Sequence, residues 1–318
     1  MQLIEAKGLA RTFTTKHGEV HAVRGVDFTV ADGEIVGFLG PNGAGKTTTM
    51  RMLTTLLAPT SGSATVTGFD LRARAAEIRA RIGFVSQNGG ANPGYDVTTE
   101  LVLQARLYGL SPAAAAGAAD EVCDFLQLGD LRDRIIGTLS GGQRRRLDIA
   151  LGLVHKPRLI FLDEPSAGLD PAGRNHLWSY IRRLRDDLGT TVFLSTHYLD
   201  EADALCDRVL ILDQGKIIAE DSPEALKRRV SGDAVTVEID GDLGPALERL
   251  KAQPFVRDLV EEERRLRFRT DVGERAIMAT VRALDQSGAD VTAIHVDRPT
   301  LDDVFLTLTG AGDGAVNA

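Results

Sequence analysis

A glycine-rich segment near the N-terminus has the composition of a phosphate-binding loop. The run Gly40-Pro41-Asn42-Gly43-Ala44-Gly45-Lys46-Thr47 follows a strand-like stretch, 34–39, and precedes the stretch 48–57, for which we predict a helix. Glycines let backbone N–H groups wrap a phosphate at the positive end of such a helix. In this pattern Lys46 reaches the β- and γ-phosphates, and the Thr47 hydroxyl binds Mg²⁺. The run therefore predicts a site for a nucleoside triphosphate and Mg²⁺.

A second chemical feature is a pair of carboxylates at the end of an apolar stretch. Asp163 and Glu164 follow Leu159-Ile160-Phe161-Leu162, which predicts a buried strand. Open α/β sheets bind their ligands at the carboxyl ends of strands. Beside a phosphate loop, Asp163 is expected to hold Mg²⁺ and Glu164 to orient and polarise an attacking water.

The pentapeptide Leu139-Ser140-Gly141-Gly142-Gln143 opens a segment with helical spacing, 144–154. Ser140 can cap that helix, and the two glycines expose backbone N–H groups to an anion. The basic run Arg144-Arg145-Arg146 is expected to be a solvated helix face.

The three motifs together resemble the ATP-binding cassette (ABC) family, whose signature is the pentapeptide at 139–143, and the resemblance covers residues 1–220. It implies that residues 40–47 and Thr48 bind ATP. It also implies that Gln87 contacts Mg²⁺ and the water, that Asp170 belongs to the D-loop, and that His197 touches the γ-phosphate. Phe13 stands where the family places an aromatic ring against adenine, although a plain core role for Phe13 stays open.

The resemblance also implies partners. Two cassettes of this family close head to tail, so that each ATP lies between Lys46 of one copy and Ser140 and Gly142 of the other; a homodimer is the simplest form. Stretches 38–57, 195–202 and 299–306 are similar to the daunorubicin/doxorubicin-resistance type of ATP-binding subunit, which works with a separate polytopic permease of the ABC-2 type. A groove near residues 87–97 would receive that permease. We therefore expect the ATP-hydrolysing subunit of an exporter, at the cytoplasmic face of the cell membrane.

The elements that must position these residues alternate between strand-like and helix-like segments, which indicates an α/β fold. Within a cassette domain over 1–222, the helix-rich stretch 98–157 is expected to form a helical subdomain. Asp32-Gly33 is typical of a hairpin turn. Residues 223–318 have the order strand–helix–strand–strand–helix–strand, which predicts a small ferredoxin-like α+β domain followed by one more helix. We expect residues 310–318 to be frayed.

Composition limits the alternatives. The chain has 318 residues and a formal net charge of −8, which argues against a nucleic-acid partner that needs a broad basic surface. No apolar run approaches the roughly 18 residues that span a bilayer, and no secretory signal is recognised. Export of a lipid or polysaccharide by the same type of machinery stays open. A soluble ABC ATPase acting on ribosomes or in DNA repair is less expected, because the paired cassettes, heptad insertions or zinc-spaced cysteines of those groups are absent from the sequence.

Overall fold

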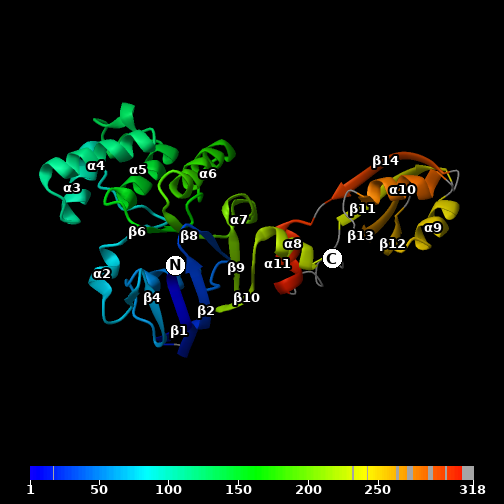
Figure 1. Cartoon of the computed structure of the whole chain (residues 1–318), viewed down its shortest axis with the longest axis horizontal. Helices are drawn as coiled ribbons and strands as arrows, with labels where there is room; N and C mark the ends of the chain where they lie inside the picture. The colour runs from blue at the N-terminus through cyan, green and yellow to red at the C-terminus, as the bar shows by residue number, and fades with distance from the viewer. Residues whose placement is uncertain are drawn as a thin grey trace. The chain divides into compact units, whose positions relative to one another are not determined.

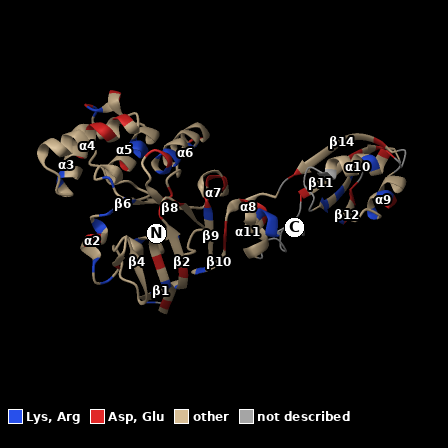
Figure 2. Cartoon of the chain, in the orientation of Figure 1, with Lys and Arg blue, Asp and Glu red and all other residues tan. Residues whose placement is uncertain are grey.

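The computed structural model describes residues 1–16, 18–230, 233–241, 243–262, 265–270, 275–285, 289–297 and 299–309. The chain divides into two compact units, Met1–Pro223 and Glu224–Ala318 (Figure 1). Acidic and basic residues are interspersed over both units (Figure 2). The expected fraying at 310–318 lies outside the described residues.

The N-terminal unit is built around a mixed six-stranded sheet with the strand order β10-β9-β3-β8-β7-β6. All neighbours in this sheet are parallel except β9 and β10, which form an antiparallel hairpin at one edge. The strands are β3 (Ile35–Leu39), β6 (Ile82–Val85), β7 (Leu159–Asp163), β8 (Thr191–Thr196), β9 (Arg208–Asp213) and β10 (Lys216–Asp221). Strands β3, β7 and β8 are buried along their whole length, which explains their continuous apolar sequences.

A second, antiparallel sheet has the strand order β2-β1-β4-β5. Its strands are β1 (Gln2–Thr15), β2 (Gly18–Ala31), β4 (Ser61–Val66) and β5 (Phe69–Asp70). The hairpin expected at Asp32-Gly33 is wrong, because β2 and β3 belong to different sheets and the turn carries the chain from one sheet to the other. Gly33 has a φ of 77°, so the turn itself is real.

Aromatic side chains join the two sheets. Phe28 on β2 lies 5.7 Å from Phe38 on β3 and 5.9 Å from Phe193 on β8, measured between ring centroids. Phe161 on β7 extends the cluster, 5.6 Å from Phe193. Such ring pairs each stabilise a core by about 0.5–1.5 kcal/mol beyond the area they bury. The cluster therefore holds the strands whose ends carry the loop at 40–47 and the carboxylates at 163–164.

The helices of this unit lie between the strands in sequence. They are α1 (Lys46–Leu53), α2 (Ala75–Arg79), α3 (Val97–Leu107), α4 (Pro112–Phe125), α5 (Gly141–Leu153), α6 (Pro171–Asp186) and α7 (Leu199–Leu205), with short 3-10 turns at Gly129–Leu131 and Ile136–Thr138. Helices α3, α4 and α5 occupy the stretch 98–157 and lie together in Figure 1. Helix α1 ends at Leu53 rather than near Leu57, because Thr55 takes a left-handed conformation with a φ of 63°.

The second unit contains the ferredoxin-like fold that the sequence predicts. Its antiparallel sheet has the order β12-β13-β11-β14, and the core includes Val235, Val237, Leu266 and Phe268. Its elements are α8 (Pro223–Val230), β11 (Asp233–Asp240), α9 (Gly244–Lys251), β12 (Arg257–Glu262), β13 (Arg265–Thr270), α10 (Arg275–Asp285), β14 (Asp290–Asp297) and α11 (Leu301–Thr309). Among the residues described, no helix combines the length and apolarity needed to cross a bilayer.

Candidate functional site

The phosphate-type loop lies between the end of β3 and the start of α1. Gly45 precedes the helix with a φ of 106°, and a Cβ at this position would lie 2.4 Å from the carbonyl oxygen of Ala22 on β2. Only glycine combines that conformation with so close a backbone approach. The Nζ atom of Lys46 donates to the carbonyl oxygens of Gly40 at 2.7 Å and Pro41 at 3.1 Å. The loop is therefore closed around its own lysine at the N-terminus of α1.

Lys46 is almost fully buried, with 5% of its surface exposed. Burial lowers its pKa, and the negative charges of Glu164 and Asp163 partly offset that effect. Its Nζ atom lies 4.0 Å from Oε1 of Glu164. An ammonium group held in this way faces the site with little competing water, so a bound phosphate would feel its charge strongly.

Asp163 ends strand β7 and is hydrogen-bonded to two hydroxyl groups. Its Oδ1 atom accepts from Oγ of Ser195 at 2.5 Å and from Oγ1 of Thr47 at 3.2 Å. A hydroxyl and a carboxylate that meet next to a phosphate loop are the hard oxygen donors that Mg²⁺ prefers. The residues present therefore fit the metal that the sequence predicts.

Glu164 follows in a strained backbone conformation, with a φ of 47°. A non-glycine residue in this region costs about 1–3 kcal/mol and persists where neighbouring groups hold it. Its N–H donates to the backbone oxygen of Ser195 at 3.0 Å. The side chain meets Nε2 of Gln87 at 2.8 Å and lies 3.2 Å from Nδ1 of His197, the latter without the alignment of a hydrogen bond. Residues far apart in the sequence thus meet around one carboxylate.

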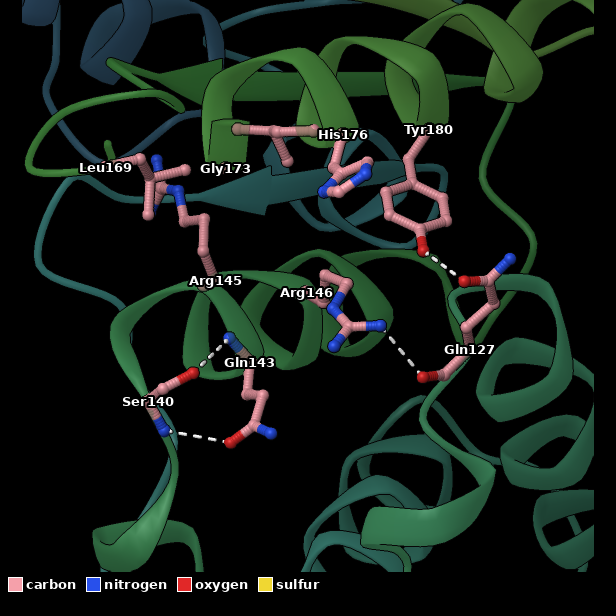
Figure 3. Close-up of a pocket in the computed structure, with 11 residues that line it drawn as sticks. Gln127, Ser140, Gln143, Arg145, Arg146, Leu169, Gly173, His176 and Tyr180 are labelled. Atoms are coloured by element: carbon pink, nitrogen blue, oxygen red, sulfur yellow. Dashed lines mark hydrogen bonds between the residues drawn. The ribbon is translucent and has the colours of Figure 1, made fainter. Parts of the chain in front are cut away.

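Helix α5 begins with the glycine pair at 141–142, and Ser140 and Gln143 on either side of that pair cap each other. The N–H of Gln143 donates to Oγ of Ser140 at 3.3 Å, and the N–H of Ser140 donates to Oε1 of Gln143 at 2.9 Å. Both residues line a cavity of about 370 Å³ between α5 and α6. Figure 3 shows their cap among the other lining residues. Tyr180 on α6 closes the far side and donates to Oε1 of Gln127 at 2.9 Å.

Comparison with known proteins decides the family. The family model for ABC transporters matches residues 23–167, and the model for the C-terminal domain of DrrA1-3-like ATP-binding proteins matches residues 222–309. The chain is 41% identical to the daunorubicin resistance ATP-binding protein DrrA3 of Streptomyces coeruleorubidus, over 93% of each chain. It is 40% identical to the daunorubicin/doxorubicin resistance ATP-binding protein DrrA of Streptomyces peucetius, over 96% of this chain and 92% of that protein. The chain belongs to the ABC transporter ATP-binding proteins.

This ABC protein is an ATP-binding, ATP-hydrolysing enzyme. Its fold is also that of solved cassettes: the dimeric structure of a bacterial ABC transporter cassette matches with a TM-score of 0.63 and 25% identity, over 69% of this chain and 98% of that one. The resemblance to the daunorubicin/doxorubicin-resistance type, which the sequence motifs indicated, is confirmed.

Two predicted site residues, Asp170 and Phe13, make their contacts outside the group formed by Lys46, Asp163 and Glu164. Asp170 directly precedes α6 and accepts a 2.9 Å hydrogen bond from the N–H of Gly173, so within one chain it acts as a helix cap. Phe13 is half-buried on β1 opposite Val20, and the guanidinium of Arg11 lies 4.6 Å from the centroid of its ring. Phe13 lies near the end of β1, whose neighbour β2 approaches the phosphate loop at Ala22.

The expectation that Arg144-Arg145-Arg146 is a solvated face is wrong for its central residue. Arg145 is 6% exposed, because its guanidinium points into the protein and donates to the backbone carbonyls of residues 163–165. Ser195 was also missed. Its position at the end of β8, two residues before His197, was the signal that could have found it.

A buried cluster links Ser166, in the segment after Glu164, to α7, and sequence reasoning did not anticipate it. The Ser166 hydroxyl donates to Oε1 of Glu201, and the indole N–H of Trp178 donates to both residues, at 3.1 Å to Ser166 Oγ and 3.2 Å to Glu201 Oε1. Burial raises the pKa of Glu201. The segment after Glu164 is thereby anchored to the helix that follows His197.

Proposed function

We propose that the chain is the ATP-hydrolysing subunit of an exporter that moves a drug or antibiotic through a separate ABC-2 type membrane permease. The observation that carries the proposal is the meeting of Lys46, Gln87 and His197 around the carboxylate of Glu164. The drug assignment is supported by the daunorubicin and doxorubicin resistance proteins, which match both units of the chain.

Within the site, each side chain has a distinct task. Lys46 and the loop N–H groups hold the β- and γ-phosphates of ATP, and the Phe13 ring stacks on adenine. Thr47 and Asp163, with Gln87, would hold Mg²⁺, which neutralises charge on the phosphates. Glu164 takes a proton from the attacking water, a step that a positioned base accelerates by about 10²–10⁴-fold. His197 contacts the γ-phosphate.

The proposed working form is a head-to-tail homodimer with ATP at the interface. Ser140 and the N–H groups of Gly141 and Gly142 stand at the start of α5, where a helix N-terminus attracts an anion. In the dimer they face the ATP held by Lys46 of the other copy. The matching bacterial cassette was solved as a dimer, which supports this arrangement.

The proposed permease contact is a groove beside the loop that carries Gln87. A cavity of about 250 Å³ is lined there by residues of β6, the loop after it, α3 and α5. Tyr95, Leu103 and Leu107 nearby in sequence are exposed apolar side chains. Apolar surface next to a groove is typical of protein contacts. The chain would then be held at the cytoplasmic face of the membrane through its partner.

The test is ATP-dependent uptake of a fluorescent anthracycline into inverted membrane vesicles. The vesicles carry a polytopic protein that co-purifies with the tagged chain, with either the parent chain or Glu164→Gln added. We expect uptake with the parent only. ATP hydrolysis and stoichiometric co-purification without uptake would contradict the drug assignment and direct the search to a lipid or polysaccharide. Hydrolysis with no polytopic partner would contradict the exporter.

A further inference from the structure

Every N–H group of the Arg145 guanidinium donates a hydrogen bond to a backbone carbonyl oxygen. A guanidinium has five N–H donors. They meet five carbonyl oxygens, those of Pro165 at 2.8 Å, Ser86 at 2.9 Å, Gln87 at 3.4 Å, Asp163 at 3.0 Å and Glu164 at 3.1 Å. Burying a charged group is costly unless it is fully hydrogen-bonded, so this position requires all of these contacts.

The five oxygens belong to two separate loops. Residues 86–87 follow β6, and residues 163–165 end and follow β7. These loops carry Gln87 and Glu164, whose side chains hydrogen-bond to each other. Arg145 therefore holds the backbone of Gln87 and Glu164, the two residues whose side chains hydrogen-bond to each other.

Glu164 is held from both of its backbone polar groups. Its N–H donates to Ser195, and its carbonyl oxygen accepts from Arg145 at 3.1 Å and from the N–H of Ala167 at 3.2 Å. Because its φ of 47° is strained, the conformation depends on such contacts. Without Arg145 the Glu164 carbonyl keeps only its contact with the N–H of Ala167, so one restraint on this strained backbone is lost.

The neighbouring arginines contact other parts of the chain. Arg144 donates to the carbonyl oxygen of Ala91 at 2.5 Å. Arg146 donates to the carbonyl oxygens of Leu126 at 3.1 Å and Gln127 at 2.8 Å. Figure 3 shows Arg146 directed toward Gln127, whereas Arg145 leaves α5 toward the segment that carries Leu169. Of the three, Arg145 is the one that reaches Gln87 and Glu164.

We propose that Arg145 is a positioning residue that couples the start of helix α5 to the catalytic base of the same chain. Ser140 lies five residues before Arg145, at the first turn of that helix. This inference rests on the proposed function, in which Ser140 and Gly142 contact the ATP of the other copy. ATP bound to one copy then fixes α5 of its partner, and Arg145 transmits that placement to Glu164 in the partner's own site.

The experiment compares Arg145→Gln and Arg145→Lys with Arg146→Gln, which removes a neighbouring arginine from the same helix. We expect Arg145→Gln to lower kcat by about 10²-fold, the effect of misplacing a reacting group by about 1 Å, with little change in KM for ATP. Arg145→Lys keeps the charge but has three donors on one nitrogen, so we expect partial rescue, to a kcat about tenfold below the parent. Arg146→Gln should keep the parent kcat.

The tryptophan fluorescence gives a second readout that needs no nucleotide. Trp178 is the one tryptophan in the sequence, and it donates to Ser166, directly after the loop that Arg145 holds. Acrylamide quenching of Trp178 should rise in both Arg145 variants and stay unchanged in Arg146→Gln. If Arg145→Gln does not fold, Arg145→Lys decides the matter.

Coupling between the two ATP sites gives a third readout. If the parent shows a sigmoidal dependence of turnover on ATP concentration, Arg145→Lys should lose it. A hyperbolic dependence in the parent would contradict the coupling between copies on which this inference rests. Parent-like kcat and quenching in an Arg145 variant would overturn the positioning role itself, whatever is found for the exporter.

Discussion

The side-chain amide of Gln87 donates a 2.8 Å hydrogen bond to Oε2 of Glu164, a residue 77 positions further along the chain. Gln87 follows β6 and Glu164 follows β7, and these strands are parallel neighbours. The bond therefore depends on sheet order rather than on local sequence. It restricts the orientation of the carboxylate that would receive the proton of the attacking water.

Replacing Gln87 tests the value of that restraint. Gln87→Ala removes the amide that orients the carboxylate and also a proposed Mg²⁺ ligand, so we expect kcat for ATP hydrolysis to fall by at least about tenfold, the equivalent of one hydrogen bond to a charged group. Steady-state ATP turnover measures it. Gln253→Ala, in the second unit, is the control. Equal kcat for both variants would contradict a role for this bond.

A buried histidine gives the chain a specific sensitivity to acid. His155 stacks on Tyr108 with 3.6 Å between ring centroids, and its Nε2 atom lies 3.0 Å from the carbonyl oxygen of Ile82. Burial lowers the pKa of His155 from 6.5 to about 4. Between pH 6.5 and about 4, His155 is protonated in the unfolded chain but stays neutral in the folded chain. Stability is therefore lost as the pH falls from 6.5 towards 4.

At about pH 5 this loss should amount to about 2 kcal/mol. Urea unfolding of the parent and of His155→Gln, at neutral pH and at about pH 5, measures it. Glutamine can still donate to Ile82 but does not titrate. Relative to the parent, the variant should therefore gain stability on acidification. A difference in unfolding free energy that is independent of pH would contradict this prediction.

Two glycines should respond to alanine in opposite directions. A Cβ at Gly83 on β6 would lie 2.2 Å from the carbonyl oxygen of Gly152 on α5, a backbone atom that cannot move aside cheaply. Gly83→Ala should destabilise the chain by about 1–3 kcal/mol. Gly117 is exposed in the middle of α4 with nothing near a new Cβ, and Gly117→Ala should stabilise by about 0.5–1 kcal/mol. Urea midpoints measure both, and shifts of the same sign would contradict the packing argument.

The sequence predicted those parts of the site that local pattern specifies. The loop at 40–47 and the carboxylates at 163–164 were found because a continuous apolar strand precedes each of them. The cap at Ser140 was found because serine is favoured directly before the first turn of a helix, whereas the reciprocal bond from Gln143 became visible only in the structure. The ferredoxin-like order of the second unit likewise follows from alternating segments.

The parts that depend on tertiary contacts were not predictable in this way. Arg145 is charged and lies between two other arginines, and its burial follows only from five carbonyls supplied by two distant loops. Helical spacing alone could not distinguish Arg145 from Arg144 and Arg146. The long strands β1 and β2 were largely missed as well. Register shifts interrupt their pairing and so obscure the simple alternation of apolar and polar residues.

The most direct test of the central claim is ATP turnover by Glu164→Gln. The amide keeps the shape of the side chain but cannot accept the proton of the water, so kcat should fall by about 10²–10⁴-fold while ATP still binds. Because ATP persists at the interface, this variant should also elute as a dimer in size-exclusion chromatography with ATP. Glu121→Gln, which changes an exposed carboxylate, should behave like the parent. Parent-like turnover by Glu164→Gln would contradict the assignment of the base and the site built around it.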